Sequence, residues 1–169
     1  MKSIQRQLMA ILLLLSVTVG MAQDKKPGEL KSVFDNYFQV KDALVKSNSK
    51  TAATESAELL ATIKAVKMES LTEAEHTAWM KVLPELKEDA EHISETNDVG
   101  HQRDHFITLS KNVYALIKVS SAGSPVYYQH CPMANKGKGA DWLSLESGIK
   151  NPYYGSQMLT CGKTVETIK

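Results

Sequence analysis

The sequence has few cysteines, no excess of either charge and few long apolar runs, and each shortage excludes a class of protein. Two cysteines in 169 residues are too few for a small scaffold held together by disulfides. The 20 Lys and Arg residues barely outnumber the 19 Asp and Glu residues, whereas nucleic-acid binding calls for a clear basic excess. Beyond the N-terminus, no apolar run is long enough to cross a bilayer.

Several signatures of enzymes and cofactor proteins are also missing. The sequence contains no Cys-x-x-Cys, no Cys-x-x-Cys-His, no His-Glu-x-x-His and no Gly-x-Ser-x-Gly. A di-iron site in a helical bundle needs two Glu-x-x-His pairs, and only Glu73 with His76 forms one. We therefore expect that the protein is not an enzyme.

The first 22 residues have the pattern of a secretory signal peptide. A short positive region precedes an apolar core over residues 8–19, and small residues on either side of Met21 indicate cleavage after Ala22. An uncleaved N-terminal anchor is the alternative. We expect residues 23–28 to form a flexible leader, and the mature protein to be periplasmic or secreted with no membrane span.

Residues 29–169 are predicted to form a single, mainly α domain. Apolar residues recur at the three-four spacing of amphipathic helices, and short connections between such helices favour an up-down four-helix bundle. Thr72 and Glu75 form a capping box, and Pro84 predicts a kink or a break. The helices are expected within residues 30–44, 51–66, 72–93 and 101–117.

An irregular C-terminal tail is predicted from about residue 125 to residue 169. Glycines and tyrosines become frequent there. Residues 126–128 and 164–168 have the composition of short strands, and residues 142–145 that of one helical turn. The tail is too short to bury a core of its own, so we expect it to pack on the bundle.

The tail also gathers soft metal ligands. His130, Cys131 and Met133 form one group, and Met158 and Cys161 form another. Thiolate and thioether sulfurs select ions such as Cu(I), and imidazole suits copper and zinc. In an extended chain Cys131 and Met133 share a face, and one helical turn would align Met158 with Cys161. The pattern predicts a site for a soft ion such as copper(I).

Two other interpretations of the same residues stay open. Two cysteines in an exported protein commonly form a disulfide, so Cys131 and Cys161 could stabilise a protein-interaction domain that binds no metal. Alternatively, zinc could be held by both cysteines with His105 and His130, because zinc takes nitrogen and thiolate ligands. In each case Cys131 and Cys161 must be neighbours in space.

His101 and His105 are four residues apart on the predicted fourth helix, a spacing that lets two imidazoles share an ion. His105 lies at the border of the apolar stripe. We expect it to turn towards the tail, where it would be a further metal ligand, and we expect His101 to face solvent.

The same segments resemble a bacterial family of unknown function, number 3347. The resemblance rests on YQHCPMA at 128–134, GADWL at 139–143, NPYYGSQMLTCG at 151–162 and RDHF at 103–106, and it extends from residue 34 to residue 168. Family members occur as small exported proteins and fused to periplasmic adaptor subunits of heavy-metal efflux pumps of the resistance-nodulation-division type.

This resemblance implies a copper- or silver-handling module that acts as a chaperone, a buffer or a donor. Its expected partner is a periplasmic efflux adaptor or another metal-handling protein. The residues that match the family pattern and would bind metal are His105, His130, Cys131, Met133, Met158 and Cys161.

Overall fold

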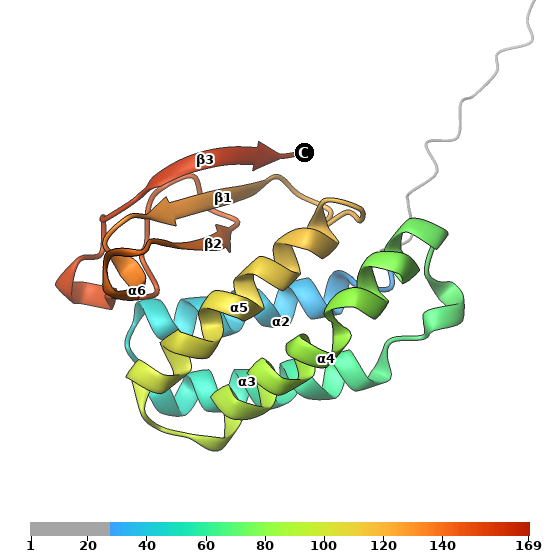
Figure 1. Cartoon of the computed structure of the whole chain (residues 1–169), viewed down its shortest axis with the longest axis horizontal. Helices are drawn as coiled ribbons and strands as arrows, with labels where there is room; N and C mark the ends of the chain where they lie inside the picture. Colours follow the sequence, from blue (N-terminus) through green and yellow to red (C-terminus); the bar gives the residue numbers. More distant parts are fainter. Residues whose placement is uncertain (1–27) are drawn as a thin grey trace, which may run out of the picture.

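The computed structural model describes residues 28–169 and contains four main helices followed by a small sheet (Figure 1). Consecutive helices pack against each other, up and down. The predicted fold class is therefore confirmed. The predicted signal peptide and nearly all of the leader lie outside the described residues. The helices are α2 (Lys31–Val45), α3 (Ser49–Ala65), α4 (Glu73–Glu95) and α5 (Val99–Ile117).

Three of these helices begin at a side-chain cap that satisfies free amide groups of the first turn. The Asn48 side chain accepts from Thr51 N at the start of α3. The predicted capping box at Thr72 and Glu75 is present at the start of α4. The Asp98 side chain accepts from two amides of α5. Pro84 does not break α4, which continues as one helix to Glu95.

A buried aromatic group links the helices to the tail. The rings of Tyr37 and Phe106 stack with centroids 5.2 Å apart, joining α2 to α5. The Tyr37 hydroxyl lies 2.8 Å from Ser110 Oγ and accepts from Leu143 N at 3.0 Å. Because Leu143 belongs to the tail, this hydroxyl connects two helices and the sheet within the core.

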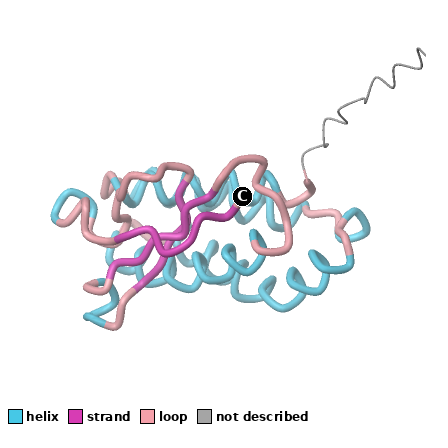
Figure 2. The backbone as a smooth tube through the Cα atoms, turned by 90° about the horizontal axis from the view of Figure 1, so that it is seen from above, coloured by secondary structure: helices cyan, strands magenta, loops and turns pink. Residues whose placement is uncertain are grey.

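The tail forms an antiparallel sheet with strand order β2-β1-β3. Its strands are β1 (Val126–Cys131), β2 (Ala140–Ser144) and β3 (Lys163–Ile168). Seen from above, the three strands lie side by side over the helices (Figure 2), and β2 packs on α5. The prediction of a helical turn at 142–145 is wrong, because Trp142 and Leu143 belong to β2 and pair with β1.

Shorter elements complete the chain. A single 3₁₀ turn, η1 (Met68–Ser70), joins α3 to α4, and another, η2 (Gly155–Gln157), lies between β2 and β3. The segment α6 (Ala134–Gly137) joins β1 to β2 and is a left-handed turn, with φ of 53° at Asn135 and 57° at Lys136. Within residues 28–169, no helix combines the length and the apolar character that a membrane crossing requires.

Arg103 holds the tail to one end of the bundle. Its Nε donates to Pro152 O at 2.8 Å, and its Nη2 donates to Ser47 Oγ at 2.9 Å. Ser47 directly follows the C-cap of α2, with φ of 52°. One guanidinium on α5 therefore fastens the end of α2 and the loop after β2.

Candidate functional site

Three histidines meet at the α4–α5 hairpin. His92 lies in the last turn of α4, and His101 and His105 lie in the first two turns of α5. One ring nitrogen from each lies within 4.8 Å of the other two. Among residues 28–169, no other three His, Cys, Asp or Glu side chains offer ligand atoms this close together. His92, His101 and His105 could therefore hold a metal ion.

The hairpin itself explains this meeting. His101 and His105 share a helix face because they are four residues apart. His92 precedes the turn between α4 and α5 by about as many residues as His101 follows it. In two antiparallel helices, positions equidistant from the turn lie opposite each other. The ring centroids of His92 and His101 are accordingly 6.1 Å apart. His105 lies one turn further along α5, with its ring centroid 4.5 Å from that of His92 and 4.8 Å from that of His101.

The buried carboxylate of Asp89 is hydrogen-bonded to the ring of His105. Its Oδ1 lies 3.0 Å from His105 Nδ1, and its residue is only 5% exposed. Burial raises the pKa of Asp89 to about 6, while the hydrogen bond to His105 opposes that rise. An ionised carboxylate can only accept, so it orients Nδ1–H of His105 towards Asp89 and leaves Nε2 as the ring nitrogen that faces away from it. In metal sites, a carboxylate commonly accepts a hydrogen bond from the ring nitrogen of a histidine that does not bind the ion.

The spacing of the three rings is close to that of an occupied site. Metal–nitrogen bonds of about 2.0–2.1 Å place the nitrogens of a tetrahedral site about 3.3 Å apart. The three nitrogens must therefore approach one another by up to about 1.5 Å on binding. His92 and His101 are exposed, whereas His105 is half-buried and held by Asp89. One fixed and two adjustable imidazoles can close around an ion.

One expectation about these residues needs correction. His105 does not turn towards the tail, because its ring lies against Asp89 and His92 of α4. The part of α5 that borders the tail carries Arg103 and Ile107 instead. His101 is exposed, as predicted, but it adjoins the other two rings. The sequence argument did not include His92, although its distance from the hairpin turn would have indicated it.

Cys131 and Cys161 are neighbours, as both the metal and the disulfide interpretations required. Their Sγ atoms lie 2.7 Å apart. Cys131 is fully buried at the end of β1, and Cys161 is half-buried just before β3. The hydrogen bond between the two sulfurs, together with partial desolvation, raises the pKa of the Cys161 thiol.

The other predicted ligands of the tail lie in different local structures. His130 Nδ1 lies 2.7 Å from Asp141 Oδ1, on the neighbouring strand. The strand ends at Cys131, so Met133 lies in a turn and is 54% exposed rather than on an extended face. Met158 is 36% exposed, and its carbonyl accepts from Cys161 N at 3.0 Å in a turn. Whether these residues bind metal stays a prediction.

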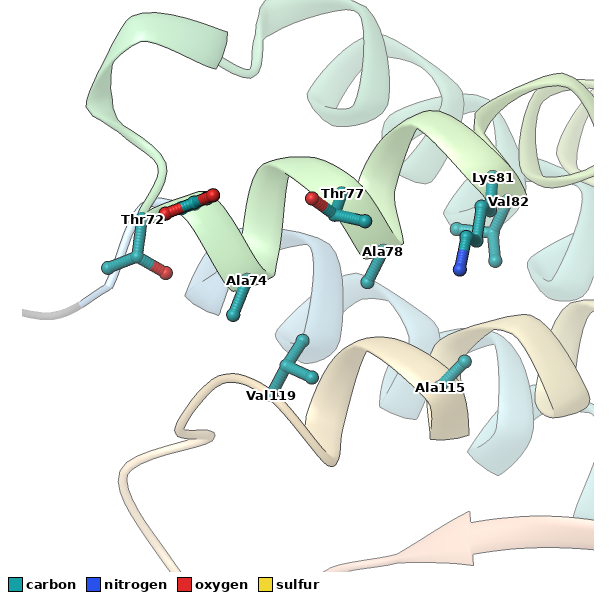
Figure 3. A pocket seen from close by; sticks show the side chains of 9 residues that line it. Thr72, Ala74, Thr77, Ala78, Lys81, Val82, Ala115 and Val119 are labelled. Atoms are coloured by element: carbon teal, nitrogen blue, oxygen red, sulfur yellow. The ribbon is translucent and has the colours of Figure 1, made fainter.

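A surface groove between α4 and α5 lies at the opposite end of these helices (Figure 3). Thr72, at the start of α4, and Val119, beyond the end of α5, lie towards one end of the groove, and Lys81, Val82 and Ala115 lie towards the other. Small residues such as Ala74, Ala78 and Ala115 form its walls. The histidines occupy the hairpin end, so the groove and the histidine group are separate features.

Comparison with known proteins assigns a family. No curated protein and no solved structure matches the chain. A family described as "Protein of unknown function (DUF3347)" matches residues 33–124, which is more than half of the chain. The match covers the four helices apart from the first two residues of α2, includes all three histidines of the hairpin, and ends before the two cysteines. The chain belongs to the DUF3347 family.

Proposed function

We propose that this protein is a metal-binding module that holds a transition-metal ion through His92, His101 and His105. The observation that carries the proposal is the meeting of three ring nitrogens within 4.8 Å, one of them backed by Asp89. Imidazole ligands suit copper, zinc and nickel. Of these, we favour copper, because the family resemblance connects the chain with heavy-metal efflux.

The proposed role is that of a carrier rather than a catalyst. An ion held by three side chains, two of them at the surface, can be passed to another protein by exchange of ligands. We propose that the protein works outside the cytoplasm as a metal chaperone, buffer or donor. An efflux adaptor, or another metal-handling protein of the periplasm, would be its partner.

Metal competition tests this proposal. The purified chain, with its thiols reduced, is titrated against a chromophoric chelator of Cu(I) and separately of Zn²⁺. The triple variant His92→Asn, His101→Asn, His105→Asn should bind more than about 100-fold more weakly, because even the outer partners of ligands contribute 10–100-fold. His76→Asn removes an exposed histidine elsewhere on α4 and should bind like the wild type.

The same experiment distinguishes the sulfur ligands predicted in the tail. If Cys131→Ser with Cys161→Ser abolishes binding while the triple histidine variant retains it, the ion belongs to the tail and the proposal is wrong. A wild type that competes for neither ion would overturn metal binding altogether and leave a protein-interaction domain. Comparison of the two chelators decides between copper and zinc.

A further inference from the structure

The two cysteines stand at the end of the sheet. Cys131 is the last residue of β1, and Cys161 lies two residues before β3. The antiparallel pairing of these strands begins beside them, with His130 opposite Lys163. A bond between the two sulfurs would therefore join β1 to β3 at the point where their hydrogen bonding starts.

The backbone around Cys161 is shaped for this approach. Gly162 has φ of 140°, and a Cβ at this position would lie 2.8 Å from both His130 O and the Trp142 ring. Only glycine, which has no Cβ, lets the backbone lie this close to His130 and Trp142. The buried Asn151 then fixes the turn, because its Nδ2 donates to Cys161 O at 2.8 Å. The sulfur of Cys161 is thus held against Cys131 by its surroundings.

The separation of the sulfurs fits a bond between them better than a shared ion. Two thiolates bound to one zinc ion at about 2.3 Å would lie about 3.7 Å apart. Cys131 Sγ and Cys161 Sγ are 2.7 Å apart. Within residues 28–169, the two thiols also belong to no group of three close His, Cys, Asp or Glu ligands.

We propose that Cys131 and Cys161 form a redox-reversible disulfide that fastens β3 to β1, with Cys161 as the sulfur that external thiols and disulfides reach. Cys131 is fully buried, whereas Cys161 lines a surface pocket with His130 and Lys163. Thiol–disulfide exchange depends on which sulfur is accessible. Cys161 is therefore the thiol that reacts first with the oxidant, and Cys131 is the thiol that resolves the mixed disulfide.

The oxidant is a disulfide, either of a thiol–disulfide oxidoreductase or of oxidised glutathione. The Cys161 thiolate attacks it, forms a mixed disulfide and releases one thiol. The Cys131 thiolate then attacks the Cys161 sulfur and releases the second thiol. The protein loses two electrons and two protons, and the oxidant gains them as two thiols. The raised pKa of Cys161 keeps its thiolate scarce, so an oxidoreductase should speed the reaction greatly.

Apart from its backbone pairing with β1, the strand that this disulfide would hold has few side-chain attachments. Most side chains of β3 are exposed. Glu166 makes the main side-chain contacts, accepting from the Tyr114 hydroxyl at 2.6 Å and pairing with Lys118. The disulfide would close the loop from residue 131 to residue 161, and reduction should lower the melting temperature by about 5–10 °C.

Mass spectrometry of the native chain in glutathione redox buffers tests the proposal. The oxidised chain should be lighter by about 2 Da than the reduced chain, and the change should reverse. Cys131→Ser should gain one glutathionyl group, on Cys161. Cys161→Ser is the matched control and should gain little, because its remaining thiol is buried.

Two results would overturn the proposal. One is a folded chain that keeps both thiols in fully oxidising buffer. The other is faster labelling of Cys131 than of Cys161. If a serine variant does not fold, partial alkylation of the reduced wild type followed by peptide mapping ranks the two thiols directly. Neither measurement depends on metal binding by the histidines, so either proposal can be wrong while the other is right.

Discussion

The ring of His105 and the carboxylate of Asp89 are joined across the α4–α5 interface, with Nδ1 3.0 Å from Oδ1. The second oxygen of the buried carboxylate, Oδ2, has no hydrogen-bond partner in the described structure. A buried, incompletely paired carboxylate costs stability. The pair is therefore poorly explained as a stabilising contact, and it fits a role in supporting His105 as the proposed metal ligand.

Replacement of Asp89 should separate these two roles. Asp89→Asn keeps an oxygen that accepts from His105 but removes the buried charge, so we expect metal affinity to fall about 10-fold or more. The free energy of unfolding should stay the same or rise. Asp104→Asn, an exposed carboxylate on α5 one residue from His105, is the matched control and should change neither. Chelator competition and urea unfolding of the three proteins provide the measurements.

If Asp89→Asn binds metal as tightly as the wild type, Asp89 does not support a ligand. If it loses affinity only together with a large loss of stability, Asp89 is a structural residue.

The hydroxyl of Tyr37 should contribute strongly to stability. Tyr37→Phe removes the partner of Ser110 Oγ and of Leu143 N, both buried, and each unsatisfied group costs about 1–3 kcal/mol. We expect the free energy of unfolding in urea to fall by about 2–4 kcal/mol. Tyr127→Phe, at a half-buried tyrosine of β1, is the control, and its free energy of unfolding should fall by much less. Equal losses in the two variants would mean that the Tyr37 hydroxyl does not join the tail to the bundle.

The sequence predicted the helices well because their signals are local. The Thr72 and Glu75 capping box and the apolar stripes depend only on neighbours a few residues apart. β2 was missed because Trp142 and Leu143 are both buried, so they lack the alternation that marks a half-buried strand. Their pairing partners on β1 are more than ten residues away.

The candidate site was predicted only in part, for a related reason. The four-residue spacing of His101 and His105 is visible in the sequence. The direction of His105 is not, because a residue at the border of an apolar stripe can turn either way. Asp89 and His92 decide it, and they belong to a different helix. In contrast, the proximity of Cys131 and Cys161 was predicted because the metal and the disulfide interpretations both require it.

Glu75 should make stability depend on pH in the acid range. Partial burial acts to raise its pKa, but hydrogen bonds from Ser120 and Thr72 outweigh burial and lower it. The folded state therefore binds this proton less readily than the unfolded state. The stabilising contribution is present above the ordinary pKa of a glutamate and is lost as the pH falls through the lower folded value.

Glu75→Gln keeps a capping side chain without the titrating group. Its stability should change less than that of the wild type between about pH 5 and pH 3. Thermal unfolding across this range measures the difference. Glu73→Gln, in the same first turn but outside the capping box, should keep the wild-type slope. A wild-type slope in Glu75→Gln would show that the acid sensitivity arises elsewhere.

Gly155 should tolerate no side chain, because it lies where the tail meets the end of α2. Its φ is 55°, and a Cβ there would contact Ser47 Oγ and lie 3.0 Å from both Arg103 Nη2 and Val45 O. Gly155→Ala must therefore displace the guanidinium that joins α2, α5 and the loop after β2. Together with the left-handed backbone, this should lower the free energy of unfolding by about 2–4 kcal/mol.

Gly148→Ala is the matched control, because a Cβ at Gly148 meets nothing within 4 Å. Urea unfolding should show a large loss for Gly155→Ala and almost none for Gly148→Ala. Similar stabilities would contradict the close packing at Arg103.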